Sequence, residues 1–211
     1  MRSYPAPQPV KPAVPSSSDC RPVSLKDQLA RFLSLCGHPF LFPPVVALVV
    51  GSLILGPAQS IKAVGTVVFF CLLPASILII RQVRKGEWSD LDVSQRKDRP
   101  HLFLLALGFL ALTVGILIVT GQSIAYAKGC VAAIILICSG WFLNRWLKPS
   151  MHSGFAMLTA AALLPFGLKW AGPAILFAGA VGWSRIQLGR HTTKEVLLGL
   201  GLGFVLGRLI A

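Results

Sequence analysis

The stretch SRIQLGRHTTKE, residues 184–195, separates two apolar runs near the end of the chain. It contains two arginines, a histidine and a glutamate, and Glu195 is the only acidic residue in the second half of the chain. Membrane helices must satisfy their backbone groups internally, so polar breaks of this kind fall at the ends of helices. We predict that one helix ends near Arg185, that the chain turns at Gly189, and that the next helix begins close to His191.

The composition indicates a membrane protein. The 211 residues are 55% hydrophobic and 13% charged, and the mean hydropathy is +0.73. These values are too apolar for a soluble domain and normal for a protein with several membrane helices. Lys and Arg outnumber Asp and Glu by 20 to 7. In a soluble chain this surplus would suggest nucleic acid. Here it fits loop charge that attracts anionic lipid, so we expect membrane lipids as partners and no nucleic acid.

Seven apolar runs make up most of the chain after residue 39. Several are shorter than the ~20 residues that cross the hydrocarbon comfortably, so their flanks must complete the crossing. We predict an all-α fold, a polytopic integral membrane helical bundle of about six to seven transmembrane helices that forms one domain over residues 39–211. The runs cover residues 40–56, 62–81, 101–120, 127–146, 152–169, 171–188 and 195–210.

Residues 1–38 lead into this domain. Residues 1–22 are rich in Pro and Ser and have no apolar run, which predicts a disordered, solvated tail. A plastid-type transit peptide is the alternative, because the tail has only one acidic residue. Residues 23–38 are amphipathic and predict a helix at the membrane interface. Its apolar face would carry Leu25, Leu29, Phe32, Leu33 and Cys36.

The basic residues predict the orientation of the bundle. If all seven runs cross the membrane, the tail and residues 82–100, 147–151 and 189–194 lie on one side, which then holds 16 of the 20 basic residues. The positive-inside rule places such a side in the cytoplasm. We therefore expect a bacterial inner-membrane protein whose N-terminus and polar clusters are cytoplasmic. The other four basic residues are Lys62, Lys128, Lys169 and Arg208.

Three polar clusters fall on this side, at residues 88–100, 148–154 and 184–195. They combine several arginines and lysines with two histidines, His152 and His191. Arginine binds phosphate oxygens bidentately, and one histidine can attack phosphorus while the other protonates the leaving oxygen. This chemistry needs no metal or cofactor, and the five cysteines lack the spacing of a metal site. Alternatively, Arg185 and Arg190 could be charges at helix ends that reach water, and His152 could be an ordinary interfacial histidine.

Glu195 has two competing interpretations. It follows Thr192 by three residues, which is the spacing of a helix capping box. It also follows His191 by four residues. If the helix starts by residue 191, the two side chains share a face, and the carboxylate could hold the imidazole tautomer. We expect the two roles to coexist only in part, since one carboxylate must serve both.

Three local features concern how helices begin, bend and pack. Ser150 follows Pro149 and precedes an apolar run, which predicts a helix N-cap whose backbone N–H groups face an anion. Pro74 and Pro165 lie within apolar runs and predict kinks. The last run carries a small-residue packing face, formed by Gly199, Gly203 and Gly207.

The third cluster resembles a signature of the type 2 phosphatidic acid phosphatase family of integral membrane phosphatases. The family signature reads K-x6-R-P, then P-S-G-H, then S-R-x5-H-x3-D. The third motif here consists of Ser184 and Arg185, five residues, His191, three residues and Glu195, with Glu in place of Asp. This motif is specific, and the resemblance covers roughly residues 40–211.

The first two motifs of that signature are also recognisable in order. The second reads PSMH at residues 149–152, with Met151 where the family has glycine. The first keeps Arg99 and Pro100, but Asp92 occupies the position of the lysine. The chain therefore resembles a divergent member of the family.

The resemblance implies a role for each matching residue. His191 would be the nucleophile that forms a phosphohistidine, Glu195 would orient it, and His152 would be the general acid. The charge of the absent lysine could come from Lys148, Lys97 or Arg96, and we favour Lys148 because it adjoins the second motif. The phosphate would then be bound by Arg99, Arg185, Ser150 and Lys148.

The activity implied by the resemblance is metal-independent hydrolysis of a lipid phosphate or diphosphate. The substrate would belong to the phosphatidate, phosphatidylglycerol phosphate or polyprenyl phosphate class. The alternative is a non-catalytic membrane protein that binds lipid phosphates through a degraded phosphatase site. Three departures from the family pattern favour that alternative: Asp92, Met151 and Glu195.

Overall fold

The computed structural model describes residues 24–88 and 99–211. The predictions for the tail, and for the part of the first polar cluster that includes Asp92, lie outside these residues. Every regular element in the described ranges is helical, so the all-α prediction is confirmed.

The described chain forms an N-terminal helix followed by a helical bundle. Its first half contains α1 (Leu25–Cys36), α2 (Phe42–Ile54), α3 (Pro57–Val67), a π-helical segment (Val68–Leu72) and α4 (Leu73–Arg84). Its second half contains α5 (Arg99–Val119), α6 (Ile124–Leu143), α7 (Met151–Ala162), a 3-10 turn (Leu164–Phe166), α8 (Leu168–Gln187) and α9 (Thr193–Ile210).

The apolar helices fit a membrane. Among the described residues, three helical segments are long and apolar enough to cross one: Pro57–Arg84, Pro100–Val119 and Ile124–Leu143. Two shorter apolar helices are Phe42–Ile54 and Met151–Phe166. Many of their large apolar side chains point away from the bundle, as expected where lipid replaces water. These helices support membrane association.

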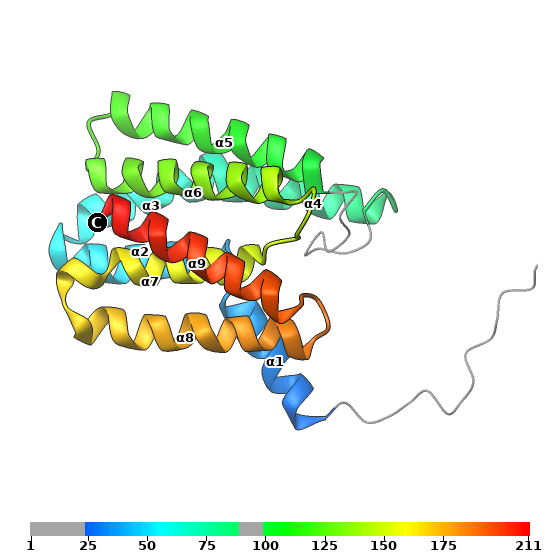
Figure 1. Cartoon of the computed structure of the whole chain (residues 1–211). Helices are drawn as coiled ribbons and strands as arrows, with labels where there is room; N and C mark the ends of the chain where they lie inside the picture. The colour runs from blue at the N-terminus through cyan, green and yellow to red at the C-terminus, as the bar shows by residue number, and fades with distance from the viewer. Residues whose placement is uncertain (1–23, 89–98) are drawn as a thin grey trace, which may run out of the picture.

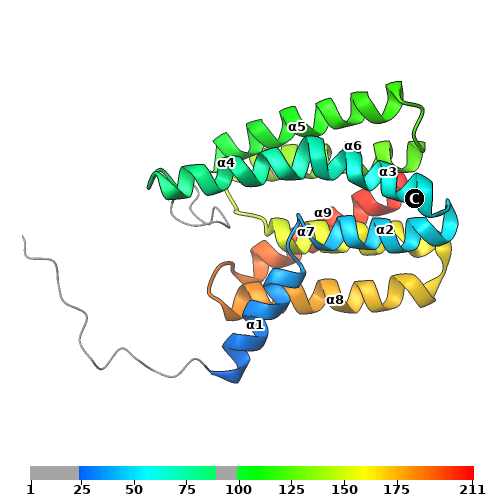
Figure 2. The ribbon, with the colours of Figure 1, turned by 180° about the vertical axis from the view of Figure 1, so that it is seen from behind.

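The helices from α2 to α9 run side by side, and α1 packs at an angle against α8 (Figures 1 and 2). One end of the bundle carries α1, the start of α5, the α6–α7 connection and the α8–α9 turn (Figure 1). The opposite end carries the α5–α6 and α7–α8 connections and the C-terminus (Figure 1). The structure thus brings residues 147–151 and 189–194 to the same end.

The glycine face of α9 packs against α7. A Cβ atom at Gly199 would lie 2.5 Å from the carbonyl oxygen of Ser150, and one at Gly207 would lie 2.5 Å from that of Leu158. Gly203 faces the backbone of Gly154 in the same way. Glycine is needed here because the two helix backbones approach too closely for a side chain. The predicted packing face is therefore confirmed, and it fixes the start of α9 beside the start of α7.

The two prolines behave differently from each other. Pro74 lies at the start of α4, directly after the π-helical segment, and the kink expected there stays a prediction. Pro165 lies in the 3-10 turn, and Gly167 then adopts a φ of 101°. The kink predicted at Pro165 is wrong, because the chain leaves α7 there and turns into α8.

The predicted amphipathic helix forms as α1, with Ser24 as its N-cap. Leu25, Leu29 and Phe32 are exposed along one side, which suits contact with a membrane surface. The opposite side carries two buried residues, Ala30 and Ser34, and packs against α8. The helix therefore joins the tail to the end of the bundle that carries the polar clusters.

Candidate functional site

Ser150 begins α7, as predicted. Its side-chain oxygen accepts a hydrogen bond from the backbone N–H of Ser153 at 3.4 Å, and the Ser153 hydroxyl lies 3.0 Å from the same oxygen. Both serines are fully buried. Because the first N–H groups of a helix have no partner within it, this helix start is suited to an anion.

The turn between α8 and α9 fixes the spacing of Arg185 and His191. The carbonyl oxygen of Arg185 accepts hydrogen bonds from the N–H groups of Arg190 at 3.0 Å and His191 at 3.2 Å. Gly189 supplies the left-handed conformation that closes this turn, with a φ of 63°. The five residues that separate Arg185 from His191 therefore form the turn that ends α8, and this turn brings the backbone of His191 back to that of Arg185.

His191 is held in one tautomer by two acceptors. Its Nδ1 atom lies 3.1 Å from the carbonyl oxygen of Lys148 and 3.2 Å from Oε2 of Glu195. A carbonyl oxygen can only accept, so Nδ1 carries the hydrogen and donates it. In the neutral ring the lone pair then lies on Nε2. The His191 side chain is only 2% exposed, which protects this arrangement from water.

Glu195 serves the helix cap and His191 through the same oxygen. Its Oε2 accepts the N–H of Thr192 at 3.0 Å, and its own N–H donates to the Thr192 hydroxyl at 3.4 Å, which completes the capping box. The expected competition between the two roles is therefore wrong. The helix starts at Thr193, so His191 lies before the cap and reaches the carboxylate from outside the helix.

The surroundings of Glu195 keep its carboxyl ionised. Glu195 lies at the polar end of the bundle, outside the three segments that are long and apolar enough to cross a membrane. Partial burial raises the pKa of the carboxyl. The N–H of Thr192, the imidazole of His191 and the charge of Lys148 outweigh that effect and hold the pKa below its ordinary value.

Arg185 is buried at the end of α8. It is only 2% exposed, and its Nη1 atom donates a 2.6 Å hydrogen bond to the hydroxyl of Ser34 on α1. This burial does not fit a helix-end charge that reaches water, whereas Arg190 is exposed and does fit one. Arg185 therefore remains a candidate phosphate ligand.

His152 is the second residue of α7 and is 6% exposed. Its ring meets the ring of His38 edge to face, with centroids 4.9 Å apart and planes at 87°. The Nδ1 atom of His38 accepts the N–H of Phe40 at 3.2 Å. His152 is therefore a buried residue beside a second histidine, which differs from an ordinary interfacial histidine in water.

The candidate residues form connected groups at one end of the bundle. Ser150 joins the start of α7 to α9, because its N–H donates to the carbonyl oxygen of Glu195 at 3.1 Å. Lys148 contacts His191 through its backbone oxygen. Arg99 begins α5, but its side chain lies outside what the structure describes.

Two residues of this end were missed from the sequence. Ser34 and His38 belong to the amphipathic segment, and each contacts a residue more than a hundred positions away. No local pattern predicts such pairs. The available hint was Ser34 itself, a small polar residue in the second half of an amphipathic helix.

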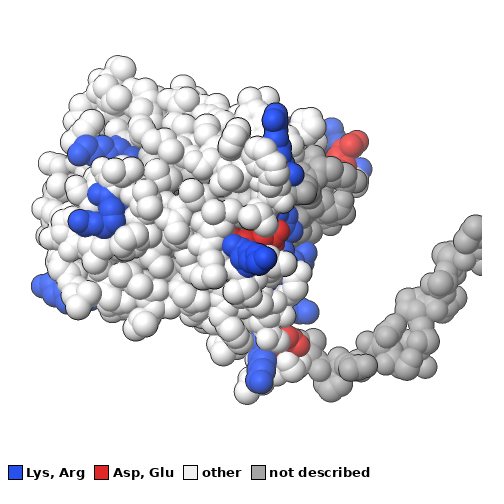
Figure 3. All heavy atoms as spheres, in the orientation of Figure 1, with Lys and Arg blue, Asp and Glu red and all other residues white. Residues whose placement is uncertain are grey.

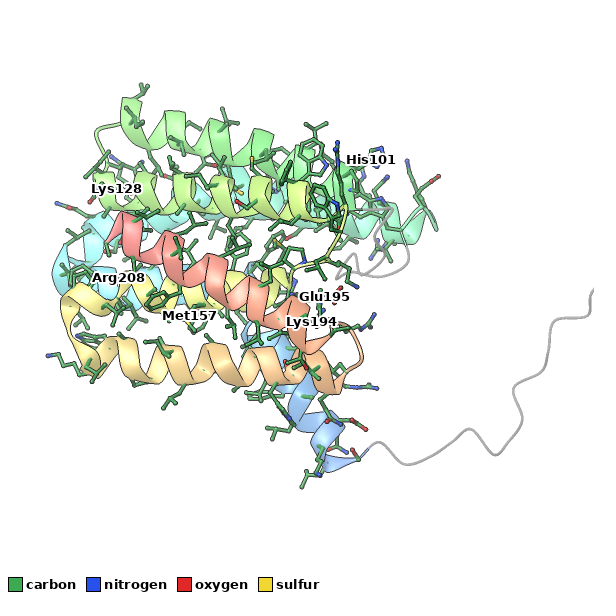
Figure 4. The ribbon with its side chains drawn as sticks, in the orientation of Figure 1. His101, Lys128, Met157, Lys194, Glu195 and Arg208 are labelled. Carbon is green, nitrogen blue, oxygen red and sulfur yellow. The ribbon has the colours of Figure 1, made fainter. Side chains whose placement is uncertain are left out.

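The charged side chains lie at the ends of the bundle and leave the middle apolar (Figure 3). Figure 4 places Glu195, Lys194 and His101 at the end with the candidate site, and Lys128 and Arg208 at the opposite end. Within residues 24–88 and 99–211, no three His, Cys, Asp or Glu side chains are grouped so as to hold a metal ion.

Comparison with protein-family models, with curated proteins and with solved structures found no match to this chain.

Proposed function

We propose that this protein is a membrane phosphatase that hydrolyses a lipid phosphate or diphosphate through a phosphohistidine on His191. The observation that carries the proposal is the pair of acceptors, Lys148 O and Glu195 Oε2, on Nδ1 of His191. A histidine held in this way presents a lone pair on Nε2, which is the atom that a phosphohistidine mechanism requires.

The first chemical step would form a bond between Nε2 of His191 and phosphorus. The bond from phosphorus to the lipid oxygen breaks, and His152 gives its proton to that oxygen. The imidazole of His191 gains positive charge, which the adjacent Glu195 carboxylate stabilises. Water then attacks phosphorus, gives up a proton to His152, and releases inorganic phosphate with His191 restored.

The phosphate would be bound where the helix ends meet. Arg185 supplies a buried guanidinium, and the start of α7 at Ser150 supplies N–H groups. Lys148 and Arg99 would add positive charge, since both belong to the polar clusters at this end of the bundle. These groups would stabilise the charge that develops on the phosphoryl oxygens.

The apolar helices suggest a substrate whose tail lies in the bilayer. We propose that six to seven helices cross the membrane, with the site at the level of the lipid headgroups. Exposed tryptophans near the site end of the bundle support this depth, because Trp prefers the interface between lipid and water. They are Trp141, Trp146 and Trp183.

A phosphate-release assay on the purified full chain tests this proposal. We expect release without added metal from at least one lipid phosphate of the phosphatidate, phosphatidylglycerol phosphate or polyprenyl phosphate class. The His191→Ala variant should release none above background, and His152→Ala should be slowed about 10²-fold or more. Equal release by wild type and His191→Ala would remove the basis of the mechanism.

The second candidate is a membrane protein that binds lipid phosphates without hydrolysing them. The observation that favours it is the divergence of the motifs, in which Asp92, Met151 and Glu195 occupy the positions of the family's lysine, glycine and aspartate. Binding of lipid phosphate by the wild-type protein, with no turnover across the same lipids, would support this candidate over the first.

A further inference from the structure

The N-terminal helix α1 reaches the candidate site with two polar side chains. Ser34 is 7% exposed and lies on the buried side of α1, one turn beyond the fully buried Ala30. A buried hydroxyl needs a hydrogen-bond partner, and here the partner is the guanidinium of Arg185 at 2.6 Å. The contact joins positions 151 residues apart in the chain.

The second contact comes from the end of α1. His38 follows the helix, and its ring meets that of His152 with 4.9 Å between centroids. Its Nδ1 atom accepts the N–H of Phe40 at 3.2 Å, which is possible only when that nitrogen carries no hydrogen. This bond therefore favours the neutral form of His38.

A neutral His38 has a consequence for His152. A positive charge on one of two adjacent imidazoles disfavours a positive charge on the other. With His38 held neutral by the Phe40 N–H, His152 is the ring of the pair that can carry the extra proton. A protonated His152 is the form that a general acid needs.

Between these two contacts, α1 packs closely against α8. Gly37 lies between Ser34 and His38, and a Cβ atom there would collide with the side chain of Val181 on α8. The close approach of α1 to α8 thus sets Ser34 against Arg185 and His38 against His152 at the same time.

We infer that α1 is part of the active site, in which Ser34 positions Arg185 to bind phosphate and His38 positions His152 to donate its proton. This inference rests on the proposed phosphatase function. It adds two positioning residues, neither of which belongs to the three motifs found in the sequence. A phosphate bound at Arg185 would then depend on the N-terminal helix as well as on α8.

Anion binding tests the role of Ser34 independently of turnover. Titration of the detergent-solubilised full chain with orthovanadate should give binding that weakens about 10- to 100-fold in Ser34→Ala, as expected for loss of a hydrogen bond to a charged group. Ser34→Thr keeps the hydroxyl and should stay within about threefold of wild type. Leu35→Ala is the matched control, because Leu35 is the next residue on α1 and is 65% exposed.

Comparing two substrates with different leaving groups tests the role of His38. Nitrophenolate leaves without a proton, whereas a lipid alkoxide needs one, so loss of general-acid function slows only the lipid substrate. His38→Phe keeps an aromatic ring beside His152 but removes the Nδ1 acceptor. We expect turnover of the lipid phosphate to fall about tenfold or more, with p-nitrophenyl phosphate turnover within about threefold of wild type.

The outcomes separate this inference from the proposed function. Unchanged or tighter vanadate binding by Ser34→Ala would overturn the role of Ser34, since tighter binding means that Ser34 competes with the anion. Equal loss of both substrates in His38→Phe would reduce His38 to a packing residue. If wild type hydrolyses neither substrate but Ser34→Ala still weakens vanadate binding, the phosphatase proposal fails while the positioning of Arg185 stands. If wild type binds no vanadate, both fail.

Discussion

At the scale of single residues, Glu195 combines two roles that the sequence predicts to coexist only in part. The i,i+3 relation to Thr192 is local, so the capping box could be predicted from the sequence and is present. The approach of His191 could not be derived in the same way, because it depends on a turn before the helix and on the carbonyl oxygen of Lys148. The position of a backbone oxygen cannot be predicted from residue types alone.

Replacing Glu195 by Gln separates its role in the helix cap from its role as a negative charge beside His191. The amide oxygen can still accept the N–H of Thr192, so we expect the free energy of unfolding to change by less than about 1 kcal/mol. Activity should fall about 10- to 100-fold, because the negative charge beside the His191 imidazolium is lost while Lys148 still holds the tautomer. Phosphate release and thermal unfolding measured side by side check this. Full activity in Glu195→Gln would leave Glu195 with a capping role only.

The lowered pKa of Glu195 predicts a specific acid sensitivity. A carboxyl whose pKa is lower in the folded than in the unfolded state stabilises the fold above its unfolded pKa, which is close to the ordinary value of 4.5. That stabilisation is lost as the pH falls through the folded pKa. Comparing the thermal unfolding of wild type and Glu195→Gln should show wild type more stable at pH 6, with the gap closing below about pH 4.5. A gap that stays constant from pH 6 to pH 3 would contradict the assignment.

At the scale of helices, the contact between α7 and α9 holds the site together. The small-residue spacing in α9 was visible in the sequence, because glycine at every fourth position has few other uses in a membrane helix. Which helix it meets was not visible, and the docking of α1 on α8 was not either. Both depend on contacts between distant parts of the chain, for which local propensity carries no information.

Adding one methyl group to α9 tests the importance of this contact. In Gly199→Ala the new Cβ would lie 2.5 Å from the carbonyl oxygen of Ser150, so we expect a loss of about 1–3 kcal/mol in stability and reduced anion binding. Gly201→Ala is the matched control on the same helix, because its Cβ would meet nothing within 4 Å. The control should be neutral or stabilised by up to about 1 kcal/mol. Equal behaviour of the two variants in unfolding and vanadate titration would mean that close α7–α9 packing is not needed.

At the scale of the whole molecule, the grouping of the connections at two ends agrees with the alternation expected from seven apolar runs. The hydropathy pattern predicts this because each run forms a helix that passes once along the bundle. The distribution of basic residues predicts which side of the membrane each end faces. The fold does not test this prediction.

A topology reporter tests that orientation. We expect a reporter inserted at residue 190, in the α8–α9 turn, to be cytoplasmic, and one at residue 122, in the α5–α6 connection, to be on the far side. Labelling of intact cells with an impermeant reagent provides the measurement. The reverse pattern would contradict the positive-inside assignment and would favour a substrate in the outer leaflet.

The central claim is that His191 becomes phosphorylated during turnover. The most direct measurement is to mix the wild-type protein with the lipid phosphate that it hydrolyses, quench within one turnover, and locate the phosphoryl group by mass spectrometry under alkaline conditions. The account predicts phosphohistidine at residue 191 that is present during turnover, disappears once the substrate is consumed, and is absent in His191→Ala. Turnover with no phosphorylation at His191, or with the phosphoryl group on another residue, would contradict it.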